Sequence, residues 1–559
     1  MQARGTVTYP RASIIVRTRR GWGPAAWKKV GHMPLITRAV VLVLAFSVPA
    51  VAQQTRAAPA KPGPWFGVPV PPPLGQEPAV IVGDRTPRPV VLPDGEAASL
   101  ELTGAAIKAD VNAIVNIAKE SRSTHEIGSG QMWGRVTGLP SGTKAVQWGA
   151  EQFRKAGIAD VKVQPIAMDP NARFWFPLSW EVRVLADPAF GPGSADVVLD
   201  SAIPLSPSDI PGGTLTAPLV YVGAANPSIL QHIDVKGKVA VQLTIPQGHM
   251  LFERGPIGSR ADQLVAKGAA GVFNLVRLPG NERSRDFSDC GNPCFNIGGR
   301  DGYFLETVMD RAAAAGVADK LRVRISLKTE TRTNLKAENA VAVMPARSDE
   351  VIILNAHVDG WFDGAGDNAD GFAVLVALAR HFAKPENRPE RTLVFVASAG
   401  HHSPGMNGPR NFVAANPDLA KRAVLVVNIE HVAQRNFSPA RSTASDGYRQ
   451  ALADSGEAPI YAGITNRAPL LDTLVQQGVT RYGTNFVSAT SNMSSGETGG
   501  YASLKAALVT IMQAPPLYHT TGEVTDVIST PGLERIARFL AFFVKEAGKA
   551  PRAQIVPGP

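Results

Sequence analysis

The sequence predicts an α/β protein with a mainly parallel, mixed sheet that is sandwiched by helices and interrupted by a β-rich insert. Strand-like and helix-like segments alternate from residue 338 onward, which is typical of a parallel sheet with helical crossovers. The expected strands are near-continuous apolar runs, as in strands buried on both faces, at residues 351–356, 392–397, 423–429 and 507–513. Residues 371–384 and 533–545 are the expected covering helices.

Two further helices and a strand are expected before the insert. Apolar residues between Ile107 and Ala118 fall on one helical face, so ordered structure is expected from about Leu100. A second helix is predicted over about 143–156, and it is followed by a strand at 161–163.

A proline-rich segment precedes this part of the chain. Residues 54–95 contain eleven prolines. Because proline neither donates to a ladder nor continues a helix, residues 53–99 are interpreted as an extended leader or wrapping arm.

The first 52 residues are interpreted as a signal peptide. Basic residues precede an apolar stretch at 39–48, and a small-x-small cleavage pattern ends at Ala52. Met33 is an alternative start, because residues 33–52 alone make a compact signal peptide. The apolar stretch is shorter than the ~20 residues of a spanning helix, which favours cleavage over a membrane anchor. We therefore expect a periplasmic or secreted protein without stable membrane insertion.

Composition excludes a polyanion-binding surface. The chain has a formal net charge of +10, but its first 52 residues hold eight Lys and Arg and no Asp or Glu, so the remainder carries +2. Nucleic acid is therefore not an expected partner. The two cysteines, Cys290 and Cys294, are expected to form a local disulfide in an oxidising compartment, and metal binding by this pair is the weaker interpretation.

The segment between residues 167 and 334 has a different pattern, in which short strands alternate with turns. Strands are expected at 219–222, 239–243 and 272–276. Its Gly-Lys-Val strand entry and its Val-Ala-Lys-Gly-Ala-Ala-Gly helix exit at 265–271 resemble the protease-associated (PA) domain. The resemblance implies an insert that lies near a substrate cleft.

Metal-binding side chains follow each buried strand of the main sheet. They are His357, Asp359, Asp367, His401, His402, Glu430, His431 and His519. In open α/β sheets ligands gather at the carboxyl ends of the strands, so these side chains are expected to converge. A single histidine after a strand is more often structural, and Asp367 alone could cap a helix. Four such positions in order favour a site for zinc or a similar divalent ion.

The order and local sequence of these residues resemble a zinc-dependent exopeptidase family. This family contains bacterial leucyl aminopeptidases, glutamate carboxypeptidases and glutaminyl cyclases. Residues 357–359 resemble its HxD motif, residues 364–371 resemble GAxDNASG, and residues 518–520 resemble the closing YHT.

The resemblance implies a role for each matching residue. His357 and His519 each bind one metal ion, Asp367 bridges both ions, and Asp359 steadies His357 from behind. It also implies a catalytic domain formed by residues 100–166 and 335–548, a PA-type insert at 167–334 and a C-terminal tail at 549–559.

Two positions depart from the family pattern. The Glu-Glu pair of the family falls on His401 and His402, and its NxD ligand position falls on Glu430. Imidazole and carboxylate both remain suitable zinc ligands. The predicted ligands of two zinc ions, or of another divalent metal, are therefore His357, Asp367, His402, Glu430 and His519.

His401 then occupies the position of the general base. Neutral imidazole can accept a proton from water, and neighbouring cations lower its unperturbed pKa of ~6.5. Glu497 is an alternative base from another loop, although a solvent-facing carboxylate is the simpler interpretation.

The predicted function is an exported metallopeptidase that hydrolyses peptide or related amide bonds through a water activated by two metals. The alternatives are a catalytically inactive homologue that binds peptide or metal, and a glutaminyl-cyclase-like or other amide hydrolase. A serine hydrolase is not favoured, because Ser403 lacks the G-x-S-x-G environment. Peptide is the expected substrate, while amino- or carboxypeptidase direction and oligomeric state are left open.

Overall fold

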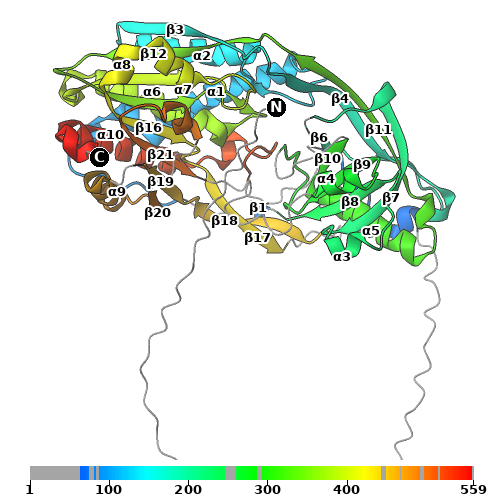
Figure 1. The fold of residues 1–559 in the computed structure, drawn as a ribbon. Helices are drawn as coiled ribbons and strands as arrows, with labels where there is room; N and C mark the ends of the chain where they lie inside the picture. Colours follow the sequence, from blue (N-terminus) through cyan, green and yellow to red (C-terminus); the bar gives the residue numbers. More distant parts are fainter. Residues whose placement is uncertain are drawn as a thin grey trace, which may run out of the picture. The chain divides into compact units, whose positions relative to one another are not determined.

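The computed structural model describes residues 63–74, 81–82, 87–205, 207–245, 260–285, 293–441, 448–465, 468–491, 496–513 and 517–556. The predicted signal peptide and Cys290 lie outside these residues. The described residues form two eight-stranded sheets, a three-stranded sheet and a two-stranded sheet (Figure 1). No helix among them is both long enough and apolar enough to cross a bilayer.

The main sheet has the strand order β20-β19-β21-β16-β13-β15-β12-β3. Its strands are β3 (Asp160–Ala167), β12 (Lys336–Met344), β13 (Ser348–His357), β15 (Arg391–Ser398), β16 (Ala423–Glu430), β19 (Ile460–Ile464), β20 (Phe486–Ser491) and β21 (Ala507–Gln513). The central four strands are parallel, while β12 pairs antiparallel with β15 and β3, and β19 pairs antiparallel with β21. The predicted mainly parallel, mixed sheet is confirmed.

Both faces of this sheet are buried, because alternate residues of each central strand enter different cores. Ile352 and Leu354 belong to the large core that also holds Ile107. Val351 and Ile353 belong to a second core. The helices of the main domain are α1 (Gly104–Ser123), α2 (Pro140–Lys155), α6 (Asp370–Ala383), α7 (Gly408–Ala415), α8 (Pro417–Arg422), α9 (Pro469–Tyr482), α10 (Thr530–Lys549) and α11 (Arg552–Ile555).

The second eight-stranded sheet comes entirely from the chain between β3 and β12. Its order is β5-β4-β11-β7-β8-β9-β10-β6, and β7 to β10 are parallel neighbours. The strands are β4 (Phe174–Val184), β5 (Val197–Val198), β6 (Ile203–Pro204), β7 (Thr214–Gly223), β8 (Val239–Thr244), β9 (Gly271–Val276), β10 (Cys294–Ile297) and β11 (Arg322–Arg332). Helices α3 (Pro227–Leu230), α4 (Ala261–Ala266) and α5 (Gly299–Ala314) belong to the same segment. We call it the inserted domain; its PA type stays a prediction.

Part of the proline-rich segment packs against the inserted domain. Trp65 is 1% exposed, its ring lies 5.3 Å from that of Phe190 and 5.5 Å from that of Phe304, and its indole nitrogen donates to Ala195 O. The expectation that ordered structure begins near Leu100 is therefore wrong, because tertiary contacts fix a segment that has no periodic pattern of its own.

The small sheets complete the described fold. One has the order β1-β18-β17, formed by β1 (Ile81–Val82), β17 (Arg435–Arg441) and β18 (Gln450–Glu457), and the other pairs β2 (Gly134–Arg135) with β14 (Gly360–Trp361). In the inserted domain Cys294 is disulfide-bonded. Its predicted partner, Cys290, lies outside the described residues.

Candidate active site

Four neighbouring parallel strands bring histidines to one edge of the main sheet. β13 ends at His357, and β15 ends three residues before His401. β16 ends just before His431, and β21 leads to the turn that carries His519. The carboxyl ends of these strands therefore deliver the predicted residues together.

Asp367 lies at the centre of this histidine cluster. Its Oδ1 is 3.3 Å from His357 Nε2 and 2.9 Å from His431 Nε2, and its Oδ2 is 2.9 Å from His402 Nε2 and 2.7 Å from His519 Nε2. Two groups of three possible metal donors share Asp367, one on each carboxylate oxygen: His357, Asp367 and His431, and Asp367, His402 and His519. A third group of the described residues consists of His357, His401 and His402. Two ligands of a tetrahedral zinc ion lie ~3.3 Å apart at ordinary bond lengths. The His357–Asp367 distance matches this value, while the other three distances are those of hydrogen bonds.

Unsatisfied polar atoms also indicate a metal. Within the described part of the chain, His357 Nε2, His402 Nε2 and Asp367 Oδ2 are buried without a hydrogen-bond partner. Such atoms are rare in folded proteins and need an explanation. A cation between them would satisfy all three atoms at once, so the residues present fit a metal ion with imidazole and carboxylate ligands.

Asp359 contacts both His357 and the backbone of His402, and so links the segments that carry these two histidines. Its carbonyl lies 3.0 Å from His357 Nδ1, which leaves Nε2 directed at Asp367. Its Oδ2 accepts hydrogen bonds from Thr137 Oγ1 at 2.9 Å and from His402 N at 3.0 Å. Although burial raises the pKa of Asp359, the hydrogen bond with His357 and the charges of His402, His357 and His401 outweigh burial and lower it. Asp359 therefore connects the strand ends of β13 and β15 as an anion.

Arg135 is a buried residue that stabilises the site and was not predicted from the sequence. Its guanidinium donates to the carbonyls of Val358, Asp363, Gly364 and Asp367, at 2.8 to 3.1 Å. It thereby fixes the loop that presents Asp367. At the end of this loop Gly371 is required, because a Cβ there would lie 2.3 Å from Asn368 Oδ1.

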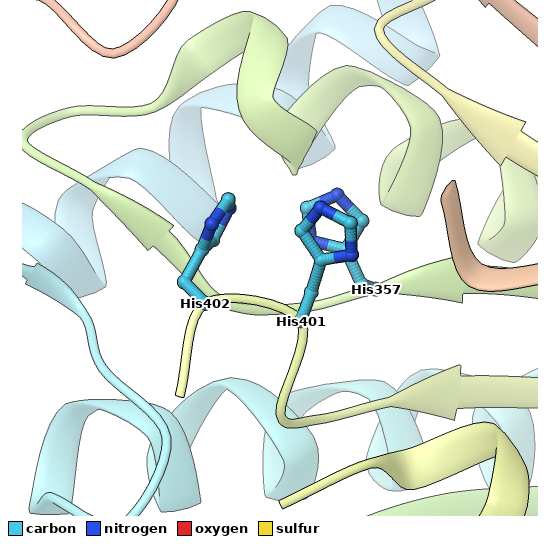
Figure 2. Close-up of side chains that lie close together, drawn as sticks. All are labelled: His357, His401 and His402. Carbon is cyan, nitrogen blue, oxygen red and sulfur yellow. The ribbon is translucent and has the colours of Figure 1, made fainter. Parts of the chain in front are cut away.

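His401 stacks on His357 and pairs with Glu497. The two imidazole rings lie 4.2 Å apart with an interplanar angle of 14° (Figure 2). His401 Nδ1 is 2.8 Å from Glu497 Oε1, and Ser398 Oγ donates to Glu497 Oε2 at 2.9 Å. Glu497 is 4% exposed, so its interpretation as a solvent-facing carboxylate is wrong. The residue packs inward because Gly496 lets its loop approach Glu430: a Cβ on Gly496 would lie 2.1 Å from Glu430 Oε2.

The protein groups alone favour protonated His401. Burial lowers its pKa, but the hydrogen bond to Glu497 and the charges of Glu430 and Asp359 outweigh burial and raise it to about 10. This direction is opposite to the one expected from the sequence. The sequence argument relied on nearby metal cations, which act against protonation. By contrast, burial and the neighbouring histidines lower the pKa of His402 to about 4, despite Asp367.

The sequence predicts Glu430 as a metal ligand, but His431 lies nearer to Asp367 than Glu430 lies to the histidines. Glu430 Oε2 accepts from Asn428 Nδ2 at 2.7 Å, and its Oε1 is 3.8 Å from His401 Nε2 and 3.9 Å from His431 Nε2. Glu430 thus borders the cluster, whereas His431 belongs to one of the three-donor groups formed by the described residues. The only available sequence signal was the position of His431 directly after Glu430 at a strand exit.

The inserted domain contacts the turn that carries His519. Ser284 forms an antiparallel β-bridge with Thr520, Arg285 N donates to His519 O at 3.0 Å, and Thr521 N donates to Arg283 O at 3.1 Å. His519 itself has a positive φ of 53°. The backbone of the inserted domain therefore borders the turn that carries His519.

Comparisons with known proteins agree with this fold. Residues 339–544 match the model of peptidase family M28. A stretch of 115 residues is 35% identical to a protein named glutamate carboxypeptidase 2 homolog from Caenorhabditis briggsae, and covers 20% of this chain and 14% of that relative. This chain thus spans about one seventh of the length of the curated relative that it matches.

Solved structures share the fold at low sequence identity. A peptidase M28 precursor from Shewanella amazonensis SB2B superimposes with a TM-score of 0.56 at 17% identity, over 82% of this chain and 100% of that one. BSAP, a zinc aminopeptidase from Bacillus subtilis, superimposes with a TM-score of 0.50 at 18% identity, over 80% and 98% of the two chains.

The match over residues 339–544 and the shared fold make this part of the chain similar to metallopeptidases.

Proposed function

We propose that this protein is an exported metal-dependent exopeptidase that removes residues from the ends of peptides with two divalent ions, zinc foremost. The observation that carries the proposal is the pair of three-donor groups that share Asp367. One group would hold an ion through His357, Asp367 and His431, and the other through Asp367, His402 and His519. Export is supported by the basic and apolar pattern of residues 1–52.

Two ions held there would acidify water and polarise the substrate carbonyl. The remaining chemistry falls to the side chains around the cluster. A hydrolytic water must lose a proton, and the leaving amine must gain one. His401 borders the cluster and can serve both steps, because imidazole accepts and returns a proton through Nε2.

Glu497 gives this base its orientation. With Nδ1–H directed at Glu497 Oε1, 2.8 Å away, the lone pair of neutral His401 lies on Nε2, on the side of Glu430. Ser398 Oγ donates to the other oxygen of Glu497 and fixes the carboxylate. In this arrangement Glu497 is a positioning residue, and His401 replaces the glutamate expected at its position.

The alternative is an inactive homologue that binds peptide or metal. It is favoured by the raised pKa of His401, because a protonated imidazole is no base. An active exopeptidase and an inactive homologue would both bind metal, but only the exopeptidase would hydrolyse peptides.

The experiment is a paired measurement of metal content and hydrolysis. Purified protein reconstituted with zinc is analysed for ions per chain and incubated with short peptides that have free, N-blocked or C-blocked ends. We expect bound metal, loss of activity on chelation and recovery on adding zinc. The blocked peptides report the direction of cleavage. Bound metal without release of any amino acid would leave the inactive homologue as the function.

A further inference from the structure

A basic pocket lies where α1 of the main domain meets the inserted domain. Its volume is about 590 Å³, and its polar lining includes Lys119, Arg122, His125, Gln131, Asp200 and Arg283. Lys119 and Arg122 come from the last turns of α1, while Asp200 and Arg283 come from the inserted domain. Both parts of the fold are needed to form this pocket.

Arg283 is the buried cation of the pocket, with 7% of its surface exposed. Its Nε donates to Asp200 O at 3.0 Å and its Nη1 to Gln131 O at 3.1 Å. Burial, together with the charge of Arg122, lowers the pKa of Arg283 to about 10. A guanidinium on the wall of a cavity can donate hydrogen bonds to an anion bound there.

The other charges of the pocket add to its positive character. Lys119 Nζ lies 3.6 Å from Asp363 Oδ2, and the Arg122 guanidinium lies 4.1 Å above the ring of Trp133 without an ion pair to any described residue. Asp200 is the single carboxylate of the lining, and its Oδ2 accepts from Leu74 N at 3.2 Å. With Lys119 paired to Asp363, Arg122 and Arg283 face Asp200, and the remaining positive charge favours a negatively charged ligand.

The pocket is close to the histidine cluster. The ring of Trp133, which contacts Arg122, lies 4.9 Å from that of Phe362, and the neighbouring Trp361 ring lies 6.5 Å from that of His402. On the other side, Arg283 is two residues from Arg285, whose backbone nitrogen donates to His519 O. Thr521 N also donates to Arg283 O at 3.1 Å, so the backbone of Arg283 lies beside the turn that carries His519.

We propose that this pocket is a substrate subsite that binds a carboxylate of the peptide while the bond to be cleaved lies at the histidine cluster. The planar forks of Arg122 and Arg283 match the two oxygens of a carboxylate. The group can belong to the C-terminus of the peptide or to an Asp or Glu side chain, which have the same chemistry. The inference rests on the proposed function, because it assigns the pocket to the same substrate.

Paired peptides test the subsite. One pair differs in a C-terminal acid or amide, and another in a Glu or Gln side chain, so the source of the carboxylate is identified by the pair that shows a preference. We expect wild type to have a KM about tenfold lower for the acidic member of that pair. Arg122→Gln and Arg283→Gln should raise this KM about tenfold at unchanged kcat and remove the preference. Arg154→Gln, an exposed arginine of α2 outside the pocket, is the matched control and should change neither.

Direct binding separates the subsite from the peptidase activity. Zinc-loaded wild type, Arg122→Gln and Arg154→Gln are titrated calorimetrically with glutarate and with uncharged glutaramide. Binding of glutarate that depends on Arg122, in a protein that cleaves no peptide, would overturn the proposed function and keep the carboxylate site. Equal glutarate binding by all three proteins, with equal KM preferences, would overturn the subsite. If Arg283→Gln does not fold, Arg122→Gln decides alone, because Arg122 is exposed on α1.

Discussion

His431 Nε2 lies 2.9 Å from Asp367 Oδ1, whereas the carboxylate of the preceding Glu430 is held by Asn428. Of these two adjacent candidate ligands, His431 lies within the histidine cluster and Glu430 lies at its border.

Replacing His431 should therefore change metal stoichiometry. In His431→Ala we expect the zinc content to fall from about two ions per chain to about one, with loss of peptidase activity, because one group of three donors is broken. Glu430→Gln is the matched variant and should keep its metal. Elemental analysis after dialysis decides the point; loss of metal in Glu430→Gln alone would assign the ligand to Glu430 instead.

The two neighbouring histidines should respond differently to substitution. His401→Ala should lower kcat by about 10²–10⁴-fold with little loss of metal, as expected for removal of a general base. His402→Ala should lose metal and activity together, because its Nε2 faces Asp367 Oδ2. His401→Glu restores the usual residue of the family and should remain active. If wild type and His401→Ala are equally inert while His401→Glu cleaves, the natural protein is a pseudoenzyme.

Glu497 should act through His401. Because the carboxylate orients the imidazole, Glu497→Gln should lower kcat by about 10–100-fold at nearly unchanged KM and metal content. In the His401→Ala background the same substitution should have no further effect on kcat, since the residue to be oriented is missing. A full additional loss in the double variant would show that Glu497 acts independently of His401.

Arg135 should be important for stability as well as activity. Its removal leaves four buried carbonyls without their donor, so Arg135→Ala should lower the free energy of unfolding by about 3–5 kcal/mol. The exposed Arg154→Gln should stay within about 0.5 kcal/mol of wild type. Chemical denaturation of the three proteins measures both values. An unchanged midpoint in Arg135→Ala would mean that the loop carrying Asp367 does not depend on this side chain.

Packing of Trp65 should stabilise the contact between the proline-rich segment and the inserted domain. Trp65→Ala removes two ring contacts and a hydrogen bond, and should destabilise the protein by about 3–5 kcal/mol. Limited proteolysis should then cut the inserted domain sooner than in wild type. Val91→Ala, at an exposed position of the same segment, provides the control.

Much of the main fold follows from local patterns in the sequence. The apolar runs at 351–356 and 392–397 fall inside β13 and β15, because a strand buried on both faces leaves a continuous hydrophobic signal. The same signal marks where each strand ends. This is why His357 and His519 could be placed near each other from the sequence, although 162 positions separate their numbers.

Other parts of the site leave no local signal. Arg135 serves carbonyls more than 220 positions away, and nothing around it distinguishes it from a surface arginine. Whether Glu430 or His431 faces Asp367 depends on how the chain turns after β16, which a strand pattern does not encode. Glu497 is buried only because Gly496 allows a close approach to Glu430, a contact that depends on the assembled fold.

The β-bridge between Ser284 and Thr520 gives the inserted domain a direct connection to the histidine cluster. Thermodynamic coupling between two events is reciprocal. If seating of the inserted domain holds His519 in place, then an ion bound by His519 must hold the inserted domain to the same degree. Metal binding and docking of the inserted domain are then thermodynamically coupled. Deleting the inserted domain would therefore change the affinity for the ion.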